Sequence, residues 1–222
     1  CTYLTLNAQL FTPISGTGFN YDVIANGNTT AALSTNKTLV PNFCFYAKDF
    51  TSSLNPQVAP LGLPTDRIVN SAYRTEVTYQ LADYNQPNVI LVGIDSETHS
   101  FILNTPTAYT TLSLLLTNNY PSSMCVEVNF DDKTRSFFNF NTKGWDNSNA
   151  AYAGCGVVNI NTDQFSGTAL THNLYDYILT LSETDRVKKI TSIRFSKSDI
   201  GSKLYVFAAS GSNNSSYTGI KA

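Results

Sequence analysis

Apolar and polar residues alternate most clearly in the C-terminal third of the chain, over residues 174–181, 189–195 and 203–209. Alternation of β-branched and aromatic residues with polar ones, interrupted by Ser, Asp and Gly clusters, is typical of β-strands. In the middle segment, KITSIRF, a strict period of two puts Ile190 and Arg194 on one face and Phe195 on the other. We expect three consecutive strands that together form the closing sheet of the fold.

Shorter runs of the same kind recur through the rest of the chain. They predict strands over residues 19–26, 31–35, 42–49, 76–82, 88–93, 100–103, 111–117, 124–130, 134–141 and 157–160. Of these, residues 111–117 are the best candidate for the centre of a sheet. Residues 50–70 are predicted to form a long loop, because three prolines exclude a central strand or a helix interior. No segment has a clear helical period, so the pattern predicts an all-β sandwich or barrel.

Composition narrows the class further. A chain of 222 residues can bury a full core as one domain, which we place at residues 9–211, with a flexible tail or linker start at residues 212–222. Charged residues make up 14%, and the net charge is −2 with two histidines. No basic field attracts nucleic acid or an anionic membrane, so we expect neither nucleic-acid binding nor membrane insertion.

The N-terminal residues and the cysteines bear on the compartment. Residues 1–8 (CTYLTLNA) are uncharged and largely apolar, which favours the end of a removed signal peptide. An ordinary first strand and a lipidated N-terminus at Cys1 are the alternatives. The other cysteines, Cys44, Cys125 and Cys155, match no zinc spacing. Cys44 lies in an apolar strand, and the sequence leaves open whether Cys125 and Cys155 pair.

The order of several motifs resembles one recurrent domain. The motifs are FNYDVIANG, FYAKDF, GLPTDRIVNS, YQLADYNQPNVILV, TPTAYTTLSLLLT, VEVNFDDKTRSFFNF, the Gly-Trp pair at 144–145, and LYDYILTLS, KKITSIRF and LYVFAAS. They cover residues 19–211 and are similar to a secreted β-sandwich module of Bacteroidetes-type surface proteins. Its last strands look like those of galactose-binding-type jelly rolls. The resemblance implies a jelly-roll β-sandwich on a secreted or cell-surface protein, commonly presumed to bind glycan, and it brings no catalytic residues.

The candidate binding site is the turn-rich segment that holds the only tryptophan. A sugar ring offers an apolar face for stacking and hydroxyls for hydrogen bonds, so its site needs an aromatic ring beside amides or carboxylates. The residues with that composition are Trp145, Asp146, Asn147, Asn149 and Tyr152. This hypothesis requires Trp145 to be at least half exposed; the alternative is a tryptophan that plugs the end of the sandwich.

A second candidate comprises Asn173, Tyr175 and Tyr177, although packing within a sheet explains the two tyrosines more simply. Asp83-Tyr84-Asn85 falls in a turn between strands. An aspartate side chain that hydrogen-bonds to the backbone of such a turn explains this segment without a ligand.

Catalytic and metal candidates are weaker. Glu127 shares a strand face with Cys125 and Asn129, and a glycoside hydrolase would pair it with a second carboxylate. The sequence does not fix that partner among Glu76, Glu97, Asp176 and Glu183. We predict no catalytic residue, no metal site and no cofactor, with a structural calcium at Asp131, Asp132 or Asp163 as the weak alternative, since no D-x-D-x-D pattern occurs.

These observations predict a non-catalytic, secreted or cell-surface module that binds a glycan or surface polysaccharide. Other domains of a larger chain are a further candidate partner. A purely structural or adhesion domain is the alternative, and a glycoside hydrolase that uses Glu127 is the third hypothesis.

Overall fold

A computed structural model describes residues 10–27, 42–51, 61–93, 97–166, 172–197 and 201–214. Over these ranges the chain forms strands and turns and no helix, which confirms the all-β prediction. None of these parts contains a helix that is long and apolar enough to cross a membrane. The predicted signal remnant at residues 1–8, the strand at residues 31–35 and residues 215–222 of the tail lie outside the described residues.

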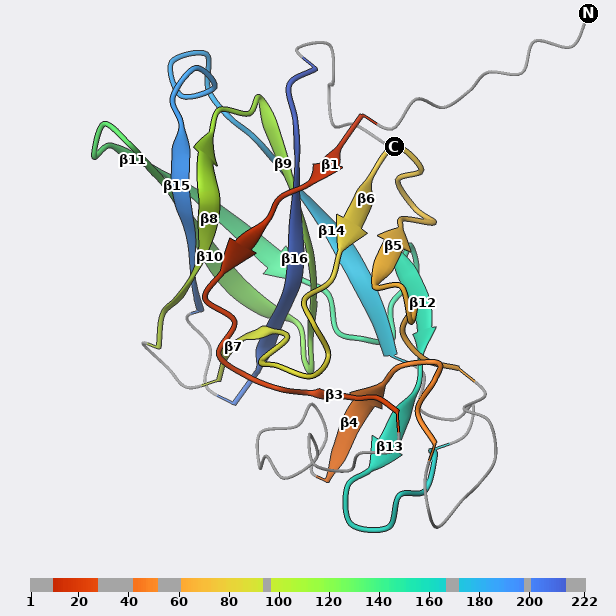
Figure 1. Cartoon of the computed structure of the whole chain (residues 1–222). Coiled ribbons are helices and arrows are strands. Elements are labelled where there is room, and N and C mark those ends of the chain that lie inside the picture. The colour runs from red at the N-terminus through yellow and green to blue at the C-terminus, as the bar shows by residue number, and fades with distance from the viewer. Residues whose placement is uncertain are drawn as a thin grey trace, which may run out of the picture.

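Two sheets form the body of the molecule (Figure 1). The six-stranded sheet contains β1 (Thr12–Pro13), β16 (Leu204–Ser212), β9 (Thr111–Asn118), β14 (His172–Thr180) and β12 (Tyr152–Cys155), and β7 (Ile90–Val92) also pairs with β16. The five-stranded sheet runs in the order β11 (Arg135–Thr142), β10 (Ser122–Phe130), β15 (Ile190–Lys197), β8 (His99–Thr107) and β2 (Gly16–Thr17). Their inner faces enclose a core of leucine, valine, isoleucine and phenylalanine side chains.

The strand order defines the fold class. Eight strands, β7 to β11 and β14 to β16, can be numbered one to eight in chain order. The six-stranded sheet then holds strands one, eight, three and six, in the order β7-β16-β9-β14, and the five-stranded sheet holds strands two, seven, four and five, in the order β8-β15-β10-β11. Most connections among these eight strands therefore cross from one sheet to the other, and of the eight only β10 and β11 form a hairpin within a sheet. Two sheets with this double Greek-key order make a jelly roll, so the chain is a jelly-roll β-sandwich.

A third layer covers the outside of the six-stranded sheet, on the right and below in Figure 1. It contains a sheet of β13 (Val157–Asn159), β4 (Phe43–Tyr46) and β3 (Ile24–Ala25), and a pair formed by β5 (Ile68–Asn70) and β6 (Thr78–Gln80). These strands pack on the six-stranded sheet through a second core that includes Phe45, Tyr79 and Tyr205. The long loop predicted at residues 50–70 thus contains β5 in its described part.

Strand β9 shows why the third layer is needed. Every residue of β9 is buried. Leu112, Leu114 and Leu116 point into the core between the two main sheets, whereas Leu115 points into the core beneath the third layer. The prediction that residues 111–117 form the centre of a sheet is confirmed, since β9 lies between β16 and β14.

Two expectations about the C-terminal strands were wrong. The three strands do not form one closing sheet, because β14 and β16 lie in the six-stranded sheet and β15 lies in the five-stranded one. The strict alternation over β15 also fails at its start. A register shift between Ile190 and Ser192 lets Ile190 join Ile193 and Phe195 in the core, on the face opposite Arg194.

The described cysteines are free thiols. Cys155 lies in β12 beneath the third layer, whereas Cys125 lies on β10 in the five-stranded sheet. The two residues therefore belong to different sheets and do not pair. Cys44 is buried beside the aromatic rings of the third layer, as the apolar pattern of its strand predicts.

Neighbouring leucines of β9 test the three-layer arrangement. Leu114→Ala and Leu115→Ala should each lower the free energy of unfolding by about 2–5 kcal/mol, because each truncation leaves a cavity in a different core. Urea unfolding followed by circular dichroism measures both. Ile102→Ala, on the outer face of β8 with 50% of its surface exposed, is the control and should cost about 1 kcal/mol or less. If Leu115→Ala lowered the free energy of unfolding as little as Ile102→Ala does, the result would contradict the packing of the third layer on β9.

Candidate functional site

The predicted tryptophan site lies at the end of the sandwich between β11 and β12. Trp145 is partly buried and packs against the core beneath the third layer. Its ring centroid lies 4.7 Å from that of the buried His172 and 6.1 Å from that of Tyr120. Trp145 therefore exposes less of its ring than the binding hypothesis requires, and its contacts fit a residue that closes one end of the core.

The polar residues of this segment mostly hold the segment in place. The Asn147 carbonyl accepts hydrogen bonds from the Tyr175 hydroxyl at 2.9 Å and from the Asn173 side chain at 3.1 Å. The Tyr152 hydroxyl donates to the Gly62 carbonyl at 2.7 Å, so this side chain reaches the third layer. Asp146 and Asn149 are exposed, and Asn149 has a left-handed backbone with φ of 62°.

The tyrosines of the second candidate group are explained by packing, and the Asp83 turn is explained by a hydrogen bond within the turn. Tyr175 is buried, and Tyr177 packs against the main core and accepts a hydrogen bond from the Lys143 backbone at 2.7 Å. The Asp83 carboxylate accepts from the Asn85 backbone at 3.0 Å, which confirms the predicted turn chemistry.

The outer face of the five-stranded sheet carries a different arrangement. Along β11 the odd-numbered residues Arg135, Phe137, Asn139 and Asn141 are exposed, while the even-numbered residues between them are more buried. Phe137 is 57% exposed, although Phe138 and Phe140 pack against the core. A large aromatic ring is thus displayed on the polar face of an amphipathic edge strand.

Charged side chains lie on one side of this ring. The Arg135 guanidinium lies over the Phe137 ring, 5.7 Å from its centroid. The carboxylate of Glu127, directly opposite Phe137 on β10, is 3.6 Å from Arg135 Nη1 and 3.5 Å from Arg194 Nη1. Arg194 also donates through Nη2 to the Thr98 hydroxyl at 3.0 Å. The two arginines therefore hold Glu127 in a charged row across three strands.

Glu127 has no carboxylate among its nearest neighbours on this face. Its cross-strand partners are Phe137 and Arg194, and the flanking residues on β10 are Cys125 and Asn129. A glycosidase needs a second carboxyl group within about 5–10 Å across the scissile bond. The immediate surroundings of Glu127 supply arginines in that place, which favours a structural or binding role for its carboxylate.

A hollow whose outward-facing side chains are uncharged lies on the other side of the ring. The hollow has a volume of about 410 Å³ and is bordered by outward residues of β10, β11 and β15, namely Ser123, Cys125, Asn139, Asn141 and Ser196. We call these five residues the β10–β11 trough. An adjoining hollow of about 280 Å³ shares Ser123 and Asn141 and extends to Pro121. The trough thus starts beside Phe137 and runs toward the end of the sandwich that holds Trp145.

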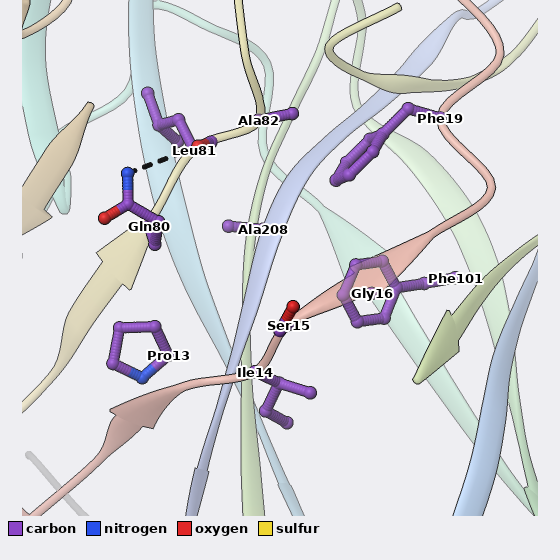
Figure 2. Close-up of a pocket in the computed structure, with 10 residues that line it drawn as sticks. All are labelled: Pro13, Ile14, Ser15, Gly16, Phe19, Gln80, Leu81, Ala82, Phe101 and Ala208. Carbon is purple, nitrogen blue, oxygen red and sulfur yellow. Dashed lines mark hydrogen bonds between the residues drawn. The ribbon is translucent and has the colours of Figure 1, made fainter. Parts of the chain in front are cut away.

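Another pocket, of about 340 Å³, lies where the N-terminal segment passes from β1 in one sheet to β2 in the other (Figure 2). Figure 2 shows Phe19 and Phe101 on one side and Ile14 and Leu81 among the other lining residues. Gly16 is required here, since a Cβ at this position would collide with the Phe101 ring. Its lining side chains are mainly apolar, and the Gln80 amide already donates to the Arg67 carbonyl at 3.1 Å. The other polar side chain, Ser15, accepts a hydrogen bond from the Asn104 amide at 2.7 Å, so both polar side chains of this pocket already have protein partners.

The residues considered for calcium do not gather. In the described parts of the chain no group of three or more His, Cys, Asp or Glu side chains is placed to hold a metal ion. Asp131 and Asp132 form the β10–β11 turn, where the Asp132 carboxylate accepts from the Thr134 backbone at 2.9 Å. Hydrogen bonds from Thr134 lower the pKa of Asp132. Asp163 lies in the third layer, in the turn after β13.

A buried polar network holds the third layer on the six-stranded sheet. Asp176 on β14 accepts hydrogen bonds from the Tyr79 hydroxyl at 2.6 Å and the Ser71 hydroxyl at 2.5 Å. The Tyr79 hydroxyl also lies 2.5 Å from the Ser113 hydroxyl on β9. Burial raises the pKa of Asp176, and the two hydrogen bonds oppose part of that rise. The network is closed by protein groups, so Asp176 serves packing and is not a partner for Glu127.

The exposed Phe137 was missed by the sequence reasoning. The strand at residues 134–141 was predicted, but the faces of RSFFNFN were not assigned. The signal was present, because the alternation separates Ser136, Phe138 and Phe140 from Arg135, Phe137, Asn139 and Asn141. An aromatic residue on the more polar of two strand faces is the feature that marks a surface site.

Comparisons with known proteins find likeness only in the fold. No family model and no curated protein matches the chain. Similar solved structures include a mutant of a family 29 carbohydrate-binding module, with 11% identity over 56% of this chain and 66% of the module and a TM-score of 0.35. A family 61 module in complex with β-1,4-galactotriose has 8% identity over 56% of this chain and 69% of its own, with a TM-score of 0.30. The enzymatically active domain of a bacteriophage tailspike protein has 11% identity over 59% of this chain and 16% of its own, with a TM-score of 0.31. At these values the likeness says nothing about what this chain binds.

The partly buried carboxyl group of Asp176 gives a pH-dependent prediction. Because its pKa is raised in the folded state, its contribution to stability is full below its ordinary value of 3.8 and is lost as the pH rises through the folded value. Relative to Asp176→Asn, the wild type should therefore lose unfolding free energy as the pH rises above this point, by at most about 1.4 kcal/mol per pH unit. Urea unfolding of both proteins across this range measures the difference. A difference that is constant with pH would contradict the burial of a titrating Asp176.

Proposed function

We propose that the protein is a non-catalytic carbohydrate-binding module, secreted or displayed at the cell surface, which binds glycan on the outer face of its five-stranded sheet. The observation that supports this most directly is the exposed Phe137 ring between a charged row and an uncharged trough. Secretion is the part of the proposal that rests on the sequence resemblance and on the composition of residues 1–8.

The chemistry of the face suits a sugar. Phe137 offers a flat apolar surface for the CH face of a pyranose ring. The Ser123 hydroxyl donates to Asn141 Oδ1 at 3.1 Å within the trough. Together with the Asn139 amide and the Ser196 hydroxyl, this pair supplies donors and acceptors for ring hydroxyls. These groups project from β-strands, and sites built on regular elements hold their geometry better than sites on loops.

Two other functions compete with this one. A structural or adhesion domain explains the β-sandwich without any ligand, and it predicts that removal of the Phe137 ring changes no binding. A glycoside hydrolase would use Glu127, and it predicts chain cleavage that disappears in Glu127→Gln. The pairing of Glu127 with two arginines favours binding over cleavage.

The variant Phe137→Ala tests the proposal. The purified wild type is first screened on a glycan array, and the affinity for each hit is then measured by calorimetry. Phe137→Ala should weaken binding by about tenfold or more, which corresponds to about 1.4 kcal/mol, because the stacking surface is lost. Its melting temperature should change little, since the ring is mainly exposed.

Two matched variants locate the site. Ile102→Ala removes an exposed apolar side chain from β8 on the same outer face and should leave the affinity unchanged. Trp145→Phe reports on the site predicted from the sequence. It should lower the melting temperature and have little effect on the affinity. Loss of affinity in Trp145→Phe but not in Phe137→Ala would move the site to the tryptophan segment. A blank array would favour the structural alternative, and new reducing ends on a bound glycan would favour the hydrolase.

A further inference from the structure

We infer, on the basis of the proposed function, that the ligand is an uncharged, linear glycan whose chain lies along β11, from Phe137 over the β10–β11 trough to Pro121. A single terminal sugar would fill only a part of this surface. The inference concerns the direction, length and charge of the ligand, and each follows from a different observation.

The direction follows from what flanks the Phe137 ring. Arg135 and Asn139 are the neighbouring outward residues on β11, one on each side of Phe137. The Arg135 guanidinium already covers the ring on its own side, and the ion pair with Glu127 holds it there. A sugar that stacks on Phe137 therefore continues toward Asn139, where the trough begins.

The length follows from the continuity of the two hollows. Both are lined by Ser123 and Asn141, and the second ends at Pro121. Asn141 lies four positions after Phe137 on β11 and pairs with Ser123 on β10, and Pro121 comes two positions before Ser123. At about 3.3 Å per residue this path is about 20 Å long, which is far longer than one pyranose ring.

The lack of charge in the ligand follows from the lining. The five residues of the trough are amides, hydroxyls and a thiol. Lys197 also lines the hollow, but it is only 6% exposed. Arg135, Arg194 and Glu127 lie in the row beside Phe137 and neutralise one another in part. The trough therefore offers hydrogen bonds to hydroxyls and no cationic group that would select a carboxylate or sulfate.

Cys125 provides a reporter in the floor of the trough. Its thiol is partly exposed, whereas Cys44 and Cys155 are buried and burial raises the pKa of both thiols. In a Cys1→Ser background, Cys125 should be the thiol that iodoacetamide modifies in the folded protein. A chain lying along the trough covers this thiol.

The first experiment measures affinity against ligand length. Uncharged β-1,4-linked oligosaccharides of glucose, mannose and galactose are compared from disaccharide to hexasaccharide by calorimetry. For the sugar type that binds, affinity should rise at least tenfold over the series and then level off. Asn141→Ala should weaken the longer ligands severalfold and leave the disaccharide unchanged, whereas Phe137→Ala should weaken all of them. Equal affinity for the disaccharide and the hexasaccharide would overturn the inference and leave the proposed function intact.

The second experiment measures position and charge. The hexasaccharide of the sugar type that binds should slow the modification of Cys125 by iodoacetamide at least tenfold at saturation, as followed by intact mass. Full reactivity of Cys125 in the saturated complex would place the ligand elsewhere. Oligogalacturonate should bind at least tenfold more weakly than the uncharged ligand, and a preference for it that falls with salt would assign binding to the arginines instead. If no oligosaccharide of either kind binds at any length, the proposed function fails together with the inference.

Discussion

A central strand that is buried on both faces constrains the whole molecule. Every residue of β9 is buried, because the six-stranded sheet packs against the five-stranded sheet on one side and against the third layer on the other. The hydroxyl of Ser113 on this strand has a hydrogen-bonding partner in the third layer, the hydroxyl of Tyr79. As a result the six-stranded sheet has little free surface, and the broad open sheet surface of the described fold is the outer face of the five-stranded sheet. The location of the proposed site is thus a consequence of how the core is covered.

Local alternation was sufficient to predict most strands and the all-β class, because a half-buried strand shows its period directly in its own residues. Local alternation did not predict which strand belongs to which sheet. Consecutive strands β14, β15 and β16 look alike along the sequence, yet the Greek-key order separates them. The bulge that moves Ile190 into the core also leaves no local trace. The third layer was hidden for another reason: its strands are short and lie among turns and prolines, and they are held by contacts with residues far along the chain.

The candidate site shows the same division between local and distant information. Composition favoured Trp145 because aromatic and amide residues cluster around it, but its contacts with His172 and the core come from β14 and are invisible in the loop itself. Phe137 stood in a predicted strand, and the choice of its exposed face was available from the alternation of β11 alone. The arginine on β15 and the hydroxyl of Ser196 that complete the surface depend on the pairing of β10 with β15, which the sequence does not show.

The pairing of β1 with β16 joins Thr12 to Gly211, almost the full length of the described chain apart. The same short N-terminal segment then crosses to the other sheet and pairs with β8 through β2. The β1–β16 pairing thus joins segments near opposite ends of the described chain, whereas β2 pairs with a strand from its middle. Contacts of such long range slow folding, because the entropy of closing the loop must be lost before the contact forms. During synthesis this pairing forms only after β16 is available, so the chain passes through a stage in which the edge of β9 that β16 later covers is open to other chains.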